Sequence, residues 1–408
     1  MFHAATMATQ IARDLLWWPG KDVMRTYLGA GVAALFVLVC VGSGSAFSAS
    51  PPEWTASDLG TLGGTNSSAA AINPSGQVVG TSDLLPGGTA RHAFSWTVGA
   101  GLVDLGTLGG TSSGAVAVNA SGQVAGNSDV PGDLTQHAFL WTPGIGMADL
   151  GTLGGTFSHA LGVNARGQVA GNSTLLGDAE THAFLWATGT GMVDLGTLDG
   201  TASNAEGMNA SGQVVGNSAA HAFLWTPGVG MTDLGTLGGT FSDANGINDR
   251  GQVFGNSDPI AADAESHGFL WTPGAGMLDL GTLGGSFSDA VAANAAGEVI
   301  GDSGEHAFLW TPTDGMTDLG TLGGTFSDVQ EGAGDGGQVG SSSLLGDTES
   351  HAFLRTQADG MVDLGTLGGS SSSARSANSA RQIVGDSSLP GDADVHATMW
   401  QPRSPGSR

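Results

Sequence analysis

Residues 104–128 read DLGTLGGTSSGAVAVNASGQVAGNS and, after a short link, residues 137–147 read HAFLWTPGIGM. This unit recurs along the whole chain. The string DLGTL, followed by HAF or a close variant, occurs eight times in the same order, with successive copies 39 to 46 residues apart. Each unit contains four short strand-like segments separated by turn residues: MxDLGTL, SxAxGI, GQVVG and HAFLWT. Four short strands in a repeat of this length predict a β-propeller blade.

The turn residues of the unit fit this interpretation. A Gly pair, here Gly109 and Gly110, follows DLGTL and permits a tight turn. Asn119 and Gly122 occupy the first and fourth positions of a type I turn, where Gly can take a positive φ, so SxAxGI and GQVVG are expected to form a hairpin. Apolar groups alternate onto both faces of HAFLWT. Each sheet must therefore be stacked between neighbours.

The fold class that follows is all-β: a β-propeller of eight four-stranded blades over residues 58–401, with residues 402–408 as a tail. An open β-solenoid is the alternative, because it also stacks repeats, but it needs polar capping units at both ends. No distinct cap follows His396. We expect residues 50–57 to form a lead-in strand, with Glu53 to Ser57 extended against the last copy and helping to close the ring.

The N-terminus predicts export. Arg25 precedes an apolar run over residues 27–41 and a small-residue stretch over residues 42–50, which is the layout of a secretory signal peptide. We therefore assign residues 1–49 as a leader, with Met24 as the possible true start. The alternative is an uncleaved anchor helix over residues 27–47. The expected location is extracellular or on the cell surface, and the alternative is membrane-anchored.

Composition excludes some partners. The chain has 37 Asp and Glu against 11 Lys and Arg, a net charge of −26. Nucleic acid binding requires basic residues that neutralise phosphates, so we expect no nucleic acid partner. We expect membrane contact only through an uncleaved N-terminal helix, and a monomer. The single Cys, Cys40, lies in the leader, so the mature part has no thiol chemistry.

The motifs HAFLW and DLGTLGG resemble those of the HAF-repeat family of probable extracellular bacterial proteins. The resemblance covers Asp58 to Trp400 and implies export and a repeat architecture, since the family has no established reaction or ligand. Three residues depart from the pattern: Gly268 (HGF), Thr398 (HAT) and Arg355, which stands where other copies have Trp. Copy eight also has Arg381 at the turn Gly.

The repeat histidines suggest a metal site, but metal ligands must converge on one ion, whereas equivalent positions in eight blades are spread around a ring. We interpret each His as structural, hydrogen-bonded to Ser or Asp within its blade. The Asp that opens each DLGTL is a natural partner or turn cap. The histidines are His92, His137, His182, His221, His267, His306, His351 and His396, and the aspartates are Asp58, Asp104, Asp149, Asp194, Asp233, Asp279, Asp318 and Asp363.

Seven tryptophans occupy the last aromatic position of HAFLW. Indole faces stack on sugars, so a carbohydrate-binding ring is one interpretation, but alternation with Phe and Leu favours a core between blades. Trp54 alone stands outside this register among the tryptophans that follow the leader. The series is Trp96, Trp141, Trp186, Trp225, Trp271, Trp310 and Trp400.

Length variation is confined to the link between the third and fourth segments, which is short in copies four and six. Insertions at one place per repeat predict a variable rim. Several of these links carry paired carboxylates suited to Ca²⁺, although none has a known calcium-loop spacing, and a solvated acidic rim is the simpler interpretation. The weak Ca²⁺ candidates are Asp129, Asp133, Asp178, Glu180, Asp263, Glu265, Asp347, Glu349, Asp392 and Asp394.

No catalytic motif emerges. A catalytic site needs unlike residues in one place, and outside copies seven and eight the copies show almost no asymmetric polar feature. We therefore expect no enzyme, no catalytic residues and no cofactor apart from possible Ca²⁺. The leading hypothesis is an interaction or ligand-binding module that uses the variable rim to bind an extracellular ligand, protein or glycan. The alternatives are a structural surface or matrix spacer and, less favoured, a carbohydrate-active enzyme.

Overall fold

The computed structural model describes residues 53–260, 265–332 and 337–403. The predicted leader, with its signal-peptide, anchor and start-site interpretations, lies outside these ranges. All regular elements within them are β-strands, and no helix there is long and apolar enough to cross a membrane. The described residues belong to one compact unit, residues 51–408.

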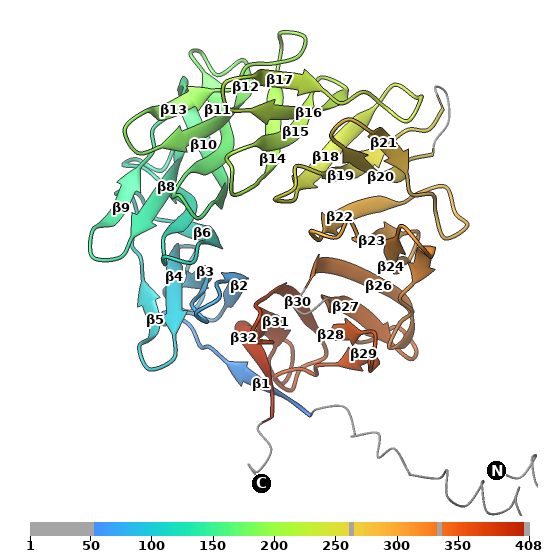
Figure 1. Cartoon of the computed structure of the whole chain (residues 1–408). Helices are drawn as coiled ribbons and strands as arrows, with labels where there is room; N and C mark the ends of the chain where they lie inside the picture. Colours follow the sequence, from blue (N-terminus) through green and yellow to red (C-terminus); the bar gives the residue numbers. More distant parts are fainter. Residues whose placement is uncertain (1–52, 261–264, 333–336, 404–408) are drawn as a thin grey trace, which may run out of the picture. The chain divides into compact units, whose positions relative to one another are not determined.

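The strands form eight four-stranded antiparallel sheets arranged as the blades of a closed ring (Figure 1), which confirms the propeller and excludes the solenoid. We number the blades along the chain. Blade 1 contains β2 (Ser67–Ile72), β3 (Val78–Asp83), β4 (Arg91–Thr97) and β5 (Gly101–Asp104). Blade 2 contains β6 (Ser113–Val118), β7 (Val124–Asp129), β8 (Gln136–Thr142) and β9 (Gly146–Asp149). Blade 3 contains β10 (Gly154–Val163), β11 (Val169–Leu175), β12 (Thr181–Ala187) and β13 (Gly191–Asp194).

The remaining blades repeat this order. Blade 4 contains β14 (Ser203–Met208), β15 (Val214–Ser218), β16 (His221–Thr226) and β17 (Gly230–Asp233). Blade 5 contains β18 (Ser242–Ile247), β19 (Val253–Ser257), β20 (His267–Thr272) and β21 (Gly276–Asp279). Blade 6 contains β22 (Asp289–Ala293), β23 (Val299–Ser303), β24 (His306–Thr311) and β25 (Gly315–Asp318). Blade 7 contains β26 (Gly323–Gly332), β27 (Gln338–Leu344), β28 (Ser350–Thr356) and β29 (Gly360–Asp363).

The last blade joins the two ends of the described chain. Blade 8 contains β30 (Ser372–Ala377), β31 (Ile383–Ser388), β32 (Val395–Pro402) and β1 (Trp54–Asp58). β1 pairs antiparallel with β32 along its whole length, from Trp54 opposite Pro402 to Asp58 opposite Thr398. The lead-in segment thus supplies the outer strand of blade 8, and the ring closes by hydrogen bonding.

The sequence repeat and the blade do not coincide. We expected a strand over MxDLGTL, but in blade 2 the outer strand β9 ends at Asp149, and the following LGTLGG passes from one blade to the next. The first DLGTL segment of a copy therefore belongs to the blade of the preceding copy. The chain turns away from the strand at Gly151, which has a φ of 75°, and Gly154, with a φ of 108°, leads it into the inner strand.

The inner hairpin of each blade is built by the Asn-x-x-Gly turn. Gly122 has a φ of 81°, as expected, and Arg381 is forced into the same region with a φ of 60°. Every inner strand carries one extra residue, a β-bulge, such as Val116 between the paired residues Ala115 and Ala117. The eight bulge residues are Ala70, Val116, Leu161, Glu206, Asn245, Val291, Gln330 and Arg375.

The core lies between blades, in what we call seams, each named by the two blades that it joins. Seam 2/3, for example, buries Leu140 from blade 2 and Phe184 from blade 3, with Trp186 packed against them. Each Trp of the HAFLW series packs in this way or is itself buried, so the series forms inter-blade core and no sugar-stacking ring. Stacking is what hides both apolar faces of each sheet.

One buried hydrogen bond repeats in every seam. The hydroxyl of the Ser that begins the SxAxG segment accepts the N–H of the residue after His in the preceding blade, as between Ser158 and Ala138 at 2.9 Å. The same hydroxyl donates to the Gly151 carbonyl at 2.6 Å. Gly151 belongs to the LGTLGG stretch that passes between the blades, which we call the crossing segment. Equivalent bonds of 2.8 to 3.0 Å occur in the other seven seams. This polar link fixes the register of one blade on the next.

Candidate functional site

The repeat histidines lie with the repeat aspartates. In blade 2, His137 Nδ1 lies 2.9 Å from the Asp149 carboxylate, joining the third strand to the fourth. The Asp149 carboxylate also accepts the N–H of Gly151 at 2.8 Å, which caps the turn that leaves the blade. All eight pairs have this form, and His396 reaches Asp58 across the chain ends. Because the pairs are dispersed around the ring and each joins the third strand of its blade to the fourth, they hold the outer strands and form no common site.

The variable links form one rim of the ring, which we call the loop rim. It consists of the described residues of the loops between the second and third strands of the blades: 84–90, 130–135, 176–180, 219–220, 258–260, 265–266, 304–305, 345–349 and 389–394. Because every blade has the same strand order and direction, these loops leave the ring on the same side. Lengths differ only here, while the strands that carry the loops are nearly identical.

Four loop-rim aspartates hold their own loops. Asp133, Asp178, Asp347 and Asp392 have φ values of 54° to 58° and their carboxylates accept a backbone N–H from the crossing segment at 2.7 Å. The Thr174 hydroxyl, together with that N–H, lowers the pKa of Asp178. The Ser343 hydroxyl does the same to the pKa of Asp347. These side chains act as loop caps, and their charge remains exposed.

The other calcium candidates do not assemble. Glu180, Glu349 and Asp394 close their loops through backbone carbonyls, and Asp129 accepts a bond from Gln136. Asp263 lies outside the described residues. Among the residues that the structure describes, no three His, Cys, Asp or Glu side chains come together as a metal-binding group.

A second polar ring, which the sequence did not reveal, lies at the turns of the inner hairpins. Asn119 Oδ1 accepts the N–H groups of Ser121 and Gln123, as a turn Asn should. Its Nδ2 donates to Gln123 Oε1 and, at 3.0 Å, to the Asn164 carbonyl of the next blade. Asn73, Asn164, Asn209, Asn248 and Asn378 make the same link. These six amides therefore join successive turns into a belt, which we call the Asn belt.

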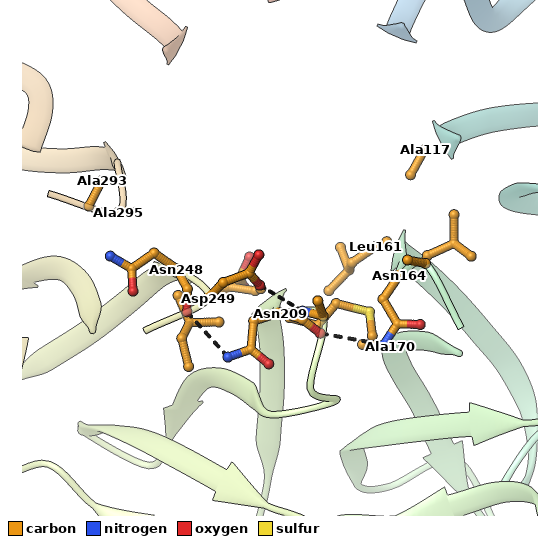
Figure 2. A pocket seen from close by; sticks show the side chains of 17 residues that line it. Ala117, Leu161, Asn164, Ala170, Asn209, Asn248, Asp249, Ala293 and Ala295 are labelled. Atoms are coloured by element: carbon orange, nitrogen blue, oxygen red, sulfur yellow. Dashed lines mark hydrogen bonds between the residues drawn. The ribbon is translucent and has the colours of Figure 1, made fainter. Parts of the chain in front are cut away.

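A cavity of about 600 Å³ lies inside the Asn belt and is lined by inner strands and turns of blades 2 to 6. Figure 2 shows Asn209 and Asn248 linked along its wall, with Leu161 on the neighbouring side. Asp249 also lines the cavity, and its carboxylate accepts the Ala210 N–H at 3.0 Å. We call this the central cavity. Its volume is that of a small-molecule site.

Glu206 gives the central cavity an asymmetry that we did not expect. It is the only carboxylate among the eight bulge residues, and it lines the cavity beside Met208. The Glu206 side chain is exposed at the cavity wall; partial desolvation there raises its pKa, and the charge of Asp243 raises it further. Glu206 is thus an exception to the near absence of asymmetric polar features that we expected in copies one to six. The signal in the sequence was a carboxylate at a variable position of SxAxGI, which shared motifs do not reveal.

Comparison with known proteins gives little beyond the fold. No family model and no curated protein matches the chain. Among solved structures, TolB of Acinetobacter baumannii is similar with a TM-score of 0.36 and 12% identity over 55% of this chain. A puromycin hydrolase gives 0.44 and 13% over 86%. A protein described as the extracellular domain of a hybrid two-component system of B. thetaiotaomicron gives 0.42 and 9% over 71%. The chain spans 58%, 55% and 40% of these three chains, respectively. No functional assignment follows.

Proposed function

We propose that the chain is an exported, non-catalytic interaction module of the HAF-repeat family, and that its loop rim binds a partner with positive charge and apolar side chains. The observation that carries this proposal is the composition of the loop rim. Its loops vary in length on an otherwise repeated scaffold, contain no Lys or Arg, and carry exposed apolar side chains. A scaffold that is constant beneath variable loops is the arrangement that binding proteins commonly use.

The apolar side chains are unusually accessible. Leu134, Leu176 and Leu345 are 87% to 88% exposed, and Leu85 and Ile260 are more than half exposed. Phe157, Phe241, Phe287 and Phe326, at the entrances to inner strands on the same rim, are 36% to 47% exposed. Blades 4 and 6, whose loops are short, contribute no such Leu or Ile. Exposed apolar groups beside unneutralised carboxylates favour a cationic, partly apolar partner.

The test exchanges loops within the chain. Residues 176–180 and 345–349 are each replaced by the Ala-Ala of residues 219–220, a link that blade 4 already tolerates. The control variant carries Ile145→Ser and Val229→Ser, which remove exposed apolar groups from turns on the opposite side. Binding of a fluorescent amphipathic Leu-Lys peptide is measured by anisotropy, with a Leu-Glu peptide as the probe of opposite charge.

The loop-exchange variant should keep the wild-type circular dichroism spectrum and melt cooperatively, but bind the Leu-Lys peptide at least tenfold more weakly, roughly as expected for losing two buried-contact groups. The control should bind as the wild type does. Unchanged binding by the loop-exchange variant, or equal binding of both peptides to the wild type, would refute the proposal. Unfolding of the variant would refute the separation of loops from scaffold.

Export has its own test. Support comes from the signal-peptide pattern that precedes the first blade. In a bacterial host that expresses the full chain, we expect a form shortened by the leader in the periplasm or medium. A full-length form found only in the cytosol would contradict export, and a full-length form in the membrane fraction would favour the anchor.

A further inference from the structure

The central cavity has the chemistry of a binding site separate from the loop rim. It lies among inner strands and turns, so side chains from several blades converge on it, unlike the dispersed His–Asp pairs. Its lining combines apolar groups, Leu161, Met208 and Ile247, with the carboxylates of Glu206 and Asp249. No Lys or Arg lines it. Such a wall attracts cations and repels anions.

The amides of the Asn belt are not free to select a ligand. Asn209 Nδ2 donates to Gln213 and to the Asn248 carbonyl, and Asn209 Oδ1 accepts from the turn backbone. Asn164 and Asn248 are engaged in the same way. The polar side-chain groups that remain for a ligand are therefore carboxylate oxygens, which accept hydrogen bonds and carry negative charge.

Glu206 is the carboxylate best placed to accept a ligand. Within the described residues it makes no hydrogen bond or ion pair, whereas Asp249 already accepts the Ala210 N–H. The charge of Asp243 also disfavours the ionised form of Glu206. A cation beside Glu206 would give its carboxylate a partner and would offset the repulsion from Asp243. The equivalent residue of blade 3 is Leu161, so the scaffold does not require a carboxylate at this position.

We propose that the central cavity binds an organic cation, an alkylammonium group carried on a short aliphatic chain, with Glu206 as its counter-ion. The ammonium group donates hydrogen bonds to Glu206. The aliphatic chain lies against Leu161, Met208 and Ile247, where each buried methylene adds to binding. An organic cation is favoured over a bare metal ion, because the described residues contain no group of three metal-ligating side chains.

The experiment uses the full chain and isothermal titration calorimetry. The probe is n-pentylammonium chloride, and its controls are sodium pentanoate, which has a similar chain with opposite charge, and ammonium chloride, which has the charge without the chain. Glu206→Gln removes the charge with little change in shape. Glu206→Leu places in blade 4 the residue that blade 3 already has. The matched control is Glu305→Gln, a carboxylate on the loop rim.

We expect pentylammonium to bind the wild type and Glu305→Gln equally. It should bind both Glu206 variants about tenfold or more weakly, as for loss of a charged hydrogen bond. Pentanoate should not bind. Absence of pentylammonium binding to the wild type, equal binding by Glu206→Gln, or equal binding of pentanoate would each overturn the proposal. Because the site is remote from the loop rim, loss of Leu-Lys peptide binding would not affect it.

Discussion

Seams 2/3 and 6/7 are built from the same repeat positions, yet they differ in their apolar clusters, in the bonds of their turn asparagines and in their buried charge. Among the described residues, the apolar cluster of seam 2/3 has seven buried members with Trp186 packed against them, whereas that of seam 6/7 has four, and Arg355 stands at the Trp position. Asn119 and Asn164 join blades 2 and 3 through the Asn belt. In blade 6, Asn294 donates to Glu298 of its own turn and, among the described residues, to no neighbouring blade.

A third difference concerns charge. In seam 2/3, Asn127 both accepts the Ala160 N–H at 2.7 Å and donates to the Ala160 carbonyl at 3.4 Å. In seam 6/7 the equivalent residue is Asp302, which accepts the Val329 N–H and has nothing to donate when ionised. Burial raises the pKa of Asp302 to about 7, and the charges of Asp328 and Asp289 contribute. We therefore expect seam 6/7 to contribute less to the stability of the ring than seam 2/3 does.

The largest expected contrast concerns the Leu of HAFLW. Leu140 is 4% exposed in seam 2/3, while the equivalent Leu309 is only partly buried in seam 6/7. We expect Leu140→Ala to lower the free energy of unfolding by about 3 kcal/mol and Leu309→Ala by about 1.5 kcal/mol, because a better-packed site leaves a larger cavity. Urea unfolding followed by Trp fluorescence measures both. Equal losses would remove the distinction between the seams.

The Asn belt provides the next contrast. Asn119→Ala removes two turn bonds and leaves the Asn164 carbonyl without its inter-blade donor, so we expect a loss of about 2 to 3 kcal/mol. Among the described residues, Asn294 bonds only within its own turn, so we expect Asn294→Ala to cost about 1 kcal/mol. The same urea titrations apply. If Asn294→Ala cost as much as Asn119→Ala, the belt would add nothing beyond the turns.

The smallest contrast depends on pH. Since the pKa of Asp302 is raised from 3.8 to about 7 in the folded chain, the folded state holds a proton that the unfolded state releases between these values. Stability from this residue is therefore present below about pH 4 and is lost as the pH rises through 7. Asp302→Asn should melt a few degrees above the wild type at pH 8 and differ little at pH 4.5, as judged by differential scanning calorimetry.

A reciprocal variant sharpens this test. Asn172 makes in seam 3/4 the two bonds that Asn127 makes in seam 2/3. Asn172→Asp should add the same pH dependence to seam 3/4. Relative to the wild type, its melting temperature should fall more at pH 8 than at pH 4.5. A stability difference between Asp302→Asn and wild type that is the same at both pH values would show that the carboxylate of Asp302 does not titrate as we describe.

Much of the fold was predictable because the same sequence unit recurs eight times. The repeated turn residues predicted the inner hairpin, and the two apolar faces of HAFLWT predicted the stacking. The choice between a ring and a solenoid was open in the sequence, because it depends on one long-range pairing, that of Trp54–Asp58 with Val395–Pro402. The extended segment before the first copy suggested such a pairing, but local pattern alone could not fix its partner or register.

The polar features were harder to predict for a different reason. Asn119 is fully accounted for by its turn, so nothing in the sequence indicated that its Nδ2 reaches the next blade. Glu206 is a single departure at a bulge, and a bulge position is not identifiable until strand register is known. The His–Asp pairs, in contrast, join two residues that recur in every copy, which is why the sequence suggested them; in blades 1 to 7 the partners are 12 residues apart.

Native-state hydrogen exchange, resolved by blade with mass spectrometry, tests most directly the claim that this ring is held by its seams and is weakest at seam 6/7. We predict that backbone amides of β23 and β26 lose protection at lower denaturant than those of β7 and β10, while β1 and β32 remain protected. Equal protection in all blades, or first opening at the pairing of β1 with β32, would contradict the account.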